Sequence, residues 1–178
     1  MALPRTSLVT EAEFLSLPES LDKIELIDGE VILSPSPTAA HQLAVQTILV
    51  GLVEWARRQP GPVTVGQAPW DVRFGDGRIL QPDLFVVLDR VSREQAGPLD
   101  RVPELCVEVL SGNRAHDRLT KRFIYGQSGV QEYWIIDTAG SVERWIGDGL
   151  SRREEIAGVL RTPLLPGFSL DVERLWSS

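Results

Sequence analysis

The sequence is short of cysteine and of long apolar runs. Its single cysteine, Cys106, cannot form an internal disulfide, and its place in an apolar segment predicts a buried, inert thiol. No apolar run reaches the roughly 18 residues that a membrane helix needs, and the first residues lack the charged and then apolar pattern of a signal peptide. These absences argue against a disulfide scaffold and a membrane-spanning protein, and we expect a cytoplasmic protein with no membrane partner.

Positive charge is also scarce, because 18 Lys and Arg residues are outnumbered by 25 Asp and Glu residues, which gives a net charge of -7. Proteins that bind nucleic acid by neutralising phosphates need clustered Lys and Arg, so tight, sequence-blind binding of a duplex by the isolated monomer is not expected. Net charge does not report distribution, however. Helical spacing predicts one basic face from Arg114, Arg118, Lys121 and Arg122, which is either a nucleic-acid contact or an ordinary solvated surface.

Three common catalytic motifs are missing. Neither G-x-G-x-x-G nor a P-loop occurs, which argues against dinucleotide and nucleoside-triphosphate binding folds, and there is no G-x-S-x-G nucleophile elbow. With 178 residues, 43% of them hydrophobic, the chain can bury a full core. We therefore expect one globular domain over residues 1–178.

Apolar periodicity and turn dipeptides predict alternating helices and short strands. Helices are expected where capping residues precede an apolar stripe, over residues 10–17, 36–58, 115–127 and 171–176. Strands are expected in short β-branched or aromatic segments, over residues 25–27, 31–33, 63–65, 70–74, 84–88, 105–110, 133–136, 141–146 and 152–156. The first two strands flank Asp28-Gly29, a dipeptide that favours a tight hairpin. Residues 63–88 are expected to form a meander.

The order of these elements predicts a mixed α/β sandwich. A long helix, three strands, a helix and a further strand follow one another, with a hairpin before them and antiparallel strands after. The helix over residues 115–127 connects the strand of Glu108 to the strand of Tyr133. Such a crossover requires the two strands to be parallel if they are neighbours in one sheet.

Two acidic residues lie in or beside apolar strands. Asp83 follows Pro82, which belongs at the beginning or edge of a strand, and Glu108 points to the face opposite Val107 and Val109. A carboxylate in such a strand is costly unless a cation or hydrogen bonds satisfy it. Glu108 therefore either pairs with an arginine or joins Asp83 and Lys121 at a site where a divalent metal and a water act on a phosphodiester.

Four segments together resemble a known family. They are Glu25-Leu26-Ile27-Asp28-Gly29-Glu30, Ser34-Pro35-Ser36-Pro37 with His41-Gln42, Gln81-Pro82-Asp83-Leu84, and Val107-Glu108-Val109-Leu110-Ser111 running on to Gly129-Val130-Gln131-Glu132-Tyr133-Trp134-Ile135-Ile136-Asp137. The match resembles the PD-(D/E)xK nuclease superfamily. More narrowly, it resembles the bacterial family of restriction-endonuclease-like proteins sometimes called the Uma-two family, a domain of unknown function.

The resemblance implies a restriction-endonuclease-like core, in the order αβββαβ, around a mixed sheet. It also implies that Asp83 and Glu108 bind a magnesium or manganese ion, with the backbone carbonyl of Val109 as a further ligand. Lys121 would orient or activate the attacking water and stabilise the developing charge. The usual lysine of the superfamily stands two residues after the glutamate, where this sequence has Leu110, so Lys121 would reach the same point from the helix.

Further residues match the narrower family. Glu25 and His41 are candidate catalytic residues, and the alternatives are a surface hairpin residue and a side chain satisfied near the start of the long helix. Arg114 and Arg118 are candidate phosphate contacts, and Asp117 could pair with Lys121 one turn away. Five more matching residues lie in the crossover helix or in the strand that follows it, and they are expected to belong to the core rather than to a base-stacking surface: Tyr125, Glu132, Tyr133, Trp134 and Asp137.

Two hypotheses of function follow. The first is a metal-dependent endonuclease that hydrolyses phosphodiester bonds, with DNA as the expected partner and with a homodimer as an option that superfamily analogy favours. The second is a non-catalytic nucleic-acid-binding or protein-binding module that keeps the nuclease fold. Metal binding at Asp83 and Glu108 discriminates between them.

Overall fold

The computed structural model describes residues 8–18, 23–34, 36–110 and 116–176. Its helices are α1 (Glu11–Leu15), α2 (Ala39–Arg57), the π-helix η1 (His116–Lys121), α3 (Arg122–Ser128) and two short 3-10 helices, η2 (Asp148–Leu150) and η3 (Val172–Leu175). Its strands are β1 (Ile24–Ile27), β2 (Glu30–Leu33), β3 (Thr64–Gln67), β4 (Val72–Arg73), β5 (Arg78–Leu80), β6 (Leu84–Val87), β7 (Leu105–Val109), β8 (Glu132–Asp137), β9 (Ser141–Ile146), β10 (Arg152–Ile156), β11 (Val159–Leu160) and β12 (Leu170–Asp171).

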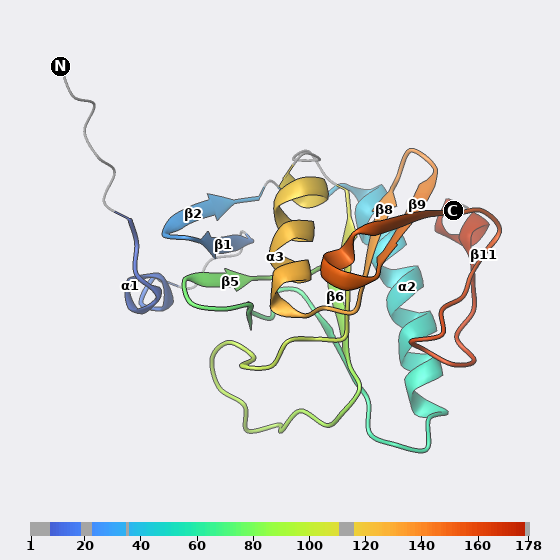
Figure 1. The fold of residues 1–178 in the computed structure, drawn as a ribbon, viewed down its shortest axis with the longest axis horizontal. Helices are drawn as coiled ribbons and strands as arrows, with labels where there is room; N and C mark the ends of the chain where they lie inside the picture. The colour runs from blue at the N-terminus through green and yellow to red at the C-terminus, as the bar shows by residue number, and fades with distance from the viewer. Residues whose placement is uncertain (1–7, 19–22, 35, 111–115, 177–178) are drawn as a thin grey trace.

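The main sheet has six strands in the order β10-β9-β8-β7-β6-β3. Strands β7 and β8 are parallel, and the other neighbouring pairs are antiparallel. The η1–α3 segment makes the crossover between the parallel pair, as the sequence predicts. In Figure 1, α3 and α2 lie on opposite sides of β6, so helices cover both faces of the sheet.

Alternation along the central strands divides the core into two layers. Leu84, Val107 and Trp134 face α2 and the C-terminal segment, whereas Phe85, Cys106 and Tyr133 face α3. Successive side chains of a strand point to opposite faces, so Glu108, two residues after Cys106, lies on the α3 face. Two predictions are therefore confirmed: the fold is mixed α/β, and Glu108 points to the face of the sheet opposite Val107 and Val109. Cys106 is buried, as expected.

The prediction of a meander over residues 63–88 is wrong for its middle strand, which belongs to a different sheet. Strand β3 pairs directly with β6, whereas β4 pairs with β5 and leaves the main sheet. Strand β5 pairs in turn with β1, which gives a second, four-stranded sheet in the order β2-β1-β5-β4. Because Arg78–Leu80 is a short run between the turn at Gly77 and Pro82, its own strand was not apparent in the sequence. The N-terminal hairpin is thereby extended into a sheet that packs beside α3 (Figure 1).

Helix boundaries follow local capping chemistry. The capping box of Thr10 and Glu13 is present, and α1 ends two residues before the predicted Leu17. Helix α2 begins after Thr38, whose hydroxyl accepts a hydrogen bond from the backbone of His41, rather than at Ser36-Pro37. Helix α3 ends at Gly129, whose φ of 96° is the left-handed conformation that glycine adopts without strain.

The predicted helix over residues 115–127 is in fact two kinds of helix. A π-helical segment, His116–Lys121, leads into the α-helical turns of α3. A π-helical turn changes which side chains share a face, and such turns are frequent at functional sites. Lys121 lies at the junction and is buried, so the helix directs this lysine inward rather than toward solvent.

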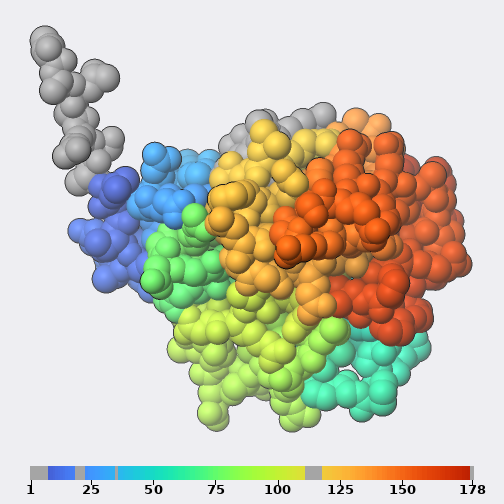
Figure 2. All heavy atoms as spheres, in the orientation of Figure 1, coloured from blue at the N-terminus to red at the C-terminus, as the bar shows by residue number. Residues whose placement is uncertain are grey.

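The two ends of the described chain lie far apart on the surface. Figure 2 shows α1 and the β1–β2 hairpin at one end of the molecule and the segment beyond β11 at the opposite end, with α3 between them. Of the helices in the described part of the chain, none has the length and apolar character needed to cross a membrane.

Candidate active site

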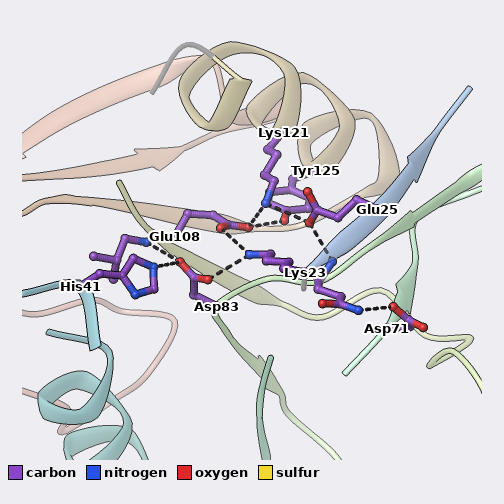
Figure 3. Close-up of polar contacts among 10 residues, drawn as sticks. Lys23, Glu25, His41, Asp71, Asp83, Glu108, Lys121 and Tyr125 are labelled. Carbon is purple, nitrogen blue, oxygen red and sulfur yellow. Dashed lines mark hydrogen bonds and ion pairs between the residues drawn. The ribbon is translucent and has the colours of Figure 1, made fainter. Parts of the chain in front are cut away.

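Asp83 and Glu108 come together on the α3 face of the main sheet. The last register pair of the antiparallel strands β6 and β7 joins Leu84 to Val107. One position further along, Asp83 stands beside Glu108 because antiparallel partners advance in opposite directions. Both residues are almost fully buried, at 6% and 1% exposure. The sequence prediction that the two acids share one site is therefore matched by their placement (Figure 3).

Asp83 is held by three donors. Its Oδ2 accepts hydrogen bonds from the backbone N–H of Val109 (2.9 Å) and from His41 Nε2 (3.1 Å), and its Oδ1 contacts Lys23 Nζ at 2.9 Å. Burial alone would raise the pKa of Asp83, but the charge of Lys23 and the hydrogen bond from His41 hold that pKa far below its ordinary value. The carboxylate is therefore ionised and can only accept, so the hydrogen in its bond with His41 is carried on Nε2.

Glu108 divides its two oxygens between different partners. Oε1 contacts Lys121 Nζ at 2.9 Å and accepts a hydrogen bond of 2.8 Å from the hydroxyl of Tyr125. Oε2 contacts Lys23 Nζ at 3.4 Å. Burial, followed by the negative charge of Glu108, raises the pKa of Tyr125 well above its ordinary value, so the phenol stays protonated and donates.

Glu25 lies on the opposite side of Lys121 from Glu108. Its Oε1 is 3.0 Å from Lys121 Nζ and accepts a 2.9 Å hydrogen bond from the backbone N–H of Gln81. The amide of Gln81 donates in turn to Asp71 at 2.9 Å. Glu25 is fully buried, so the alternative of a surface hairpin residue is wrong. Figure 3 shows Lys121 between the two glutamates, and this ammonium is therefore fixed by two carboxylates.

Lys23 is the site residue that the sequence analysis missed. Its ammonium lies between the carboxylates of Asp83 and Glu108 (Figure 3). Burial lowers the pKa of Lys23, but the charges of Glu108, Asp83 and Glu25 outweigh this effect and raise the pKa above its ordinary value. A signal was present in the composition: the chain has sixteen arginines and only two lysines. Both lysines lie in this cluster.

The predicted basic helix face does not form in the described part of the helix. Lys121 points into the acid cluster, Arg118 pairs with Glu143 and Asp137, and the guanidinium of Arg122 lies 4.4 Å from the ring centre of Trp145. The π-helical turn breaks the regular spacing on which that prediction depended. Arg114 and the side chain of Asp117 lie outside the described residues.

The aromatic and acidic residues around β8 belong to the core, as predicted. Tyr133 and Trp134 are fully buried. Glu132 accepts hydrogen bonds from the indole of Trp134 (2.6 Å) and the hydroxyl of Thr162 (2.6 Å). These contacts face α2 and the C-terminal segment, away from Asp83 and Glu108. Tyr125 is the exception, because its hydroxyl reaches Glu108.

The atoms of the cluster that could bind a metal are mainly carboxylate oxygens, and oxygen ligands suit a hard divalent cation. The two oxygens that share a cation are Asp83 Oδ1 and Glu108 Oε2, and the cation between them is the Lys23 ammonium. Across the described ranges, no group of three or more His, Cys, Asp or Glu side chains is spaced to hold a metal on its own. The space between Asp83 Oδ1 and Glu108 Oε2 is occupied by the Lys23 ammonium.

Comparisons with known proteins agree with this fold. The chain is similar to the crystal structure of "a putative nuclease belonging to DUF820" from Anabaena variabilis, with a TM-score of 0.80. The two share 23% sequence identity over 94% of this chain and 97% of that one, a likeness that shows the fold. No curated protein matches. A model of the Uma2 family, described as "Putative restriction endonuclease", matches residues 11–173. That match covers nearly the whole sequence, and the chain therefore belongs to the Uma2 family.

Proposed function

We propose that this protein is a metal-dependent endonuclease that hydrolyses phosphodiester bonds of DNA. The observation that supports this most is the convergence of Asp83, Glu108 and Lys121 at one buried site. Two carboxylates and one lysine are the groups that such a reaction uses, and the fold is that of a nuclease-like relative.

The carboxylates fit a magnesium or manganese ion. Asp83 Oδ1 and Glu108 Oε2 already share one cation, Lys23 Nζ, at 2.9 and 3.4 Å. In this proposal Asp83 and Glu108 hold the metal, with the backbone carbonyl of Val109 as a further ligand. A bound metal of this kind supplies Lewis acidity toward a phosphoryl oxygen and lowers the pKa of a coordinated water.

Lys121 acts on the attacking water and on the charge that develops at phosphorus. Its ammonium is 1% exposed and is fixed between Glu25 and Glu108, so it is oriented before the substrate arrives. A preorganised cation in a water-poor site stabilises developing negative charge more than one in bulk water. Glu25 is in this account a positioning residue for Lys121 rather than a metal ligand.

His41 and Tyr125 position the two acids. His41 Nε2 donates to Asp83 Oδ2, and Tyr125 donates to Glu108 Oε1. In each acid the bonded oxygen is the one that does not contact Lys23. These bonds fix the direction of the remaining oxygen of each carboxylate, because a carboxylate held at one oxygen cannot rotate freely.

The alternative function, a non-catalytic binding module, has one observation in its favour. Both acids already have ammonium partners, so the cluster is electrostatically satisfied without a metal. A module of this kind would bind no divalent ion at Asp83 and Glu108. A measurement of metal binding therefore distinguishes the two functions, and a cleavage assay tests the endonuclease directly.

The test is cleavage of mixed single-stranded and double-stranded DNA with MgCl2 or MnCl2. Wild type is compared with Asp83→Ala, Glu108→Ala and Lys121→Ala. Glu132→Gln is the matched control, because Glu132 is a buried acid on the neighbouring strand with its own partners on the other face. Metal-dependent cleavage that is lost in the three variants and kept in the control supports the proposal. Cleavage that survives all three substitutions contradicts it.

A further inference from the structure

We propose that Lys23 is an internal counter-ion that takes the position of the divalent ion between Asp83 and Glu108, and that metal binding displaces its ammonium group. The proposal rests on the proposed function, because it concerns the same metal site. Lys23 lies outside the sequence motifs, and its charge would neutralise the two acids before a metal binds.

The oxygens that Lys23 contacts are the ones that a metal would need. Asp83 Oδ1 lies 2.9 Å and Glu108 Oε2 lies 3.4 Å from Lys23 Nζ. A magnesium ion binds carboxylate oxygens at about 2.1 Å, closer than an ammonium group does. Two cations cannot share these two oxygens, because at such separations their mutual repulsion in a buried site is large. Metal and ammonium therefore exclude one another.

The other two oxygens of the acids are already engaged elsewhere. Asp83 Oδ2 is bonded to His41 and to the backbone of Val109, and Glu108 Oε1 is bonded to Lys121 and Tyr125. Each carboxylate thus presents one anchored oxygen and one oxygen turned toward Lys23. Removal of Lys23 from its position leaves the anchoring bonds in place, so the two oxygens that contacted Lys23 keep their direction.

Of the two lysines, Lys23 is the one that can leave. The Lys23 side chain is 20% exposed, whereas the Lys121 side chain is 1% exposed. Lys23 directly precedes β1, and its backbone carbonyl accepts a hydrogen bond from the N–H of Ser34, just after the partner strand β2. Its movement is therefore confined to the side chain, whose four methylene groups can carry the ammonium toward water. Lys121 is enclosed by Glu25 and Glu108 and stays when a metal enters.

In this arrangement Lys23 stabilises the metal-free protein and lowers the affinity of the site for a metal. Two buried carboxylates side by side repel one another and are costly without a cation. Lys23 removes that cost in the absence of metal, and the metal must then compete with it. A ligand that competes with an internal partner binds more weakly than to a site already vacated.

The experiment measures affinity for MnCl2 by isothermal titration calorimetry and melting temperature in EDTA and in MnCl2. The variants are Lys23→Met, which keeps the stem and removes the charge, and Lys23→Arg, which keeps the charge. Lys23→Gln is a second neutral variant in case Lys23→Met does not fold in EDTA. Asp83→Asn reports whether the measured binding is at this site.

We expect Lys23→Met and Lys23→Gln to bind Mn²⁺ about tenfold more tightly or better than wild type, which corresponds to about 1.4 kcal/mol. Their melting temperature in EDTA is expected to fall, and the increase on adding Mn²⁺ to exceed that of wild type. Lys23→Arg is expected not to gain affinity. Binding by the neutral variants when wild type shows none would mean that Lys23 blocks the site, and the displacement proposed for wild type would be wrong.

Two other results would overturn the displacement of Lys23, and only the second would also overturn the metal site. If wild type binds Mn²⁺ at Asp83 and the neutral variants bind it equally or more weakly, the exchange is wrong and the metal site stands. If neither wild type nor the neutral variants bind Mn²⁺, the exchange and the metal site proposed above are both wrong.

Discussion

Asp83 and Glu108 stand beside each other at the end of two antiparallel strands, with the Glu108 carboxylate in contact with Lys121 and Tyr125 and the Asp83 carboxylate in contact with His41. The residues on either side of each acid are hydrophobic or proline, so neither carboxylate has a polar neighbour on its own strand. Their partners come from other elements: His41 from α2, Lys121 and Tyr125 from the η1–α3 segment, and Lys23 from the chain before β1. The site therefore depends on the tertiary packing of both sheets.

Removal of the Asp83 charge is expected to lower stability and to change its dependence on pH. The pKa of Asp83 is held below its ordinary value of 3.8, so the unfolded chain binds more protons at this group than the folded protein. Its contribution is therefore present above pH about 4 and is lost as pH falls below it. Asp83→Asn should cost about 3 kcal/mol at pH 7, since it leaves Lys23 without its closest partner.

The measurement is urea unfolding of wild type and Asp83→Asn between pH 7 and pH 3. The difference between the two proteins should shrink as the pH falls. Asp28→Asn is the control, because Asp28 is exposed and its pair with Arg78 should be worth less than about 1 kcal/mol. A difference for Asp83→Asn that stays constant across this range contradicts the assignment.

Two glycine substitutions should change stability in opposite directions. A Cβ at Gly51 in α2 would lie 3.6 Å from the Phe168 ring, an ordinary contact, whereas a Cβ at Gly126 in α3 would lie 2.5 Å from the carbonyl oxygen of Gly149. Gly51→Ala should stabilise the protein by up to about 1 kcal/mol through helix propensity. Gly126→Ala should destabilise it by about 1–3 kcal/mol, because backbone must move.

Cleavage assays of the same pair connect packing to the site. Helix α3 carries Tyr125 and directly follows Lys121, so a shift of α3 away from η2 should also slow cleavage in Gly126→Ala. Gly51→Ala should cleave as wild type does. Equal rates in the two variants would argue that the position of α3 does not control the site.

Loss of the Tyr125 hydroxyl should weaken the site without removing its metal requirement. This hydroxyl is buried and donates to Glu108 Oε1, which keeps Lys121 as a second partner. Tyr125→Phe should cost about 1–2 kcal/mol of stability, and a smaller fraction of activity than Lys121→Ala removes. Single-turnover cleavage at saturating Mn²⁺ measures this; complete loss of activity in Tyr125→Phe would assign the phenol a direct chemical role.

His41 is expected to act through the orientation of Asp83. His41→Gln can donate a hydrogen bond from a similar position, whereas His41→Leu cannot. Mn²⁺ affinity should therefore fall in His41→Leu and be largely restored in His41→Gln. The two variants should unfold at similar urea concentrations to each other if the role is positional, and an equal loss of affinity in both would contradict that role.

Much of the fold could be predicted because its signals are local. The Asp28-Gly29 turn, the capping box at Thr10 and the glycine stop at Gly129 each act over a few residues and each appear as expected. The parallel pairing of β7 with β8 followed from the crossover helix alone. The start of α2 was misplaced by two residues because Thr38 rather than Ser36 caps it.

Other features depend on packing at long range. The transfer of β4 and β5 to the small sheet depends on pairing with β1, some fifty residues away in the chain, which no local pattern reports. The π-helical turn that directs Lys121 inward likewise has no signature in the sequence. Lys23 was missed because its partners, Asp83 and Glu108, are distant in sequence and it lies outside every motif.

The most direct test of this account is the anomalous diffraction of crystals soaked in MnCl2. We expect a manganese peak between the carboxylates of Asp83 and Glu108, with the Lys23 ammonium displaced from both and Lys121 still between Glu25 and Glu108. A peak elsewhere, or no peak with Lys23 in contact with both acids at saturating Mn²⁺, would contradict it.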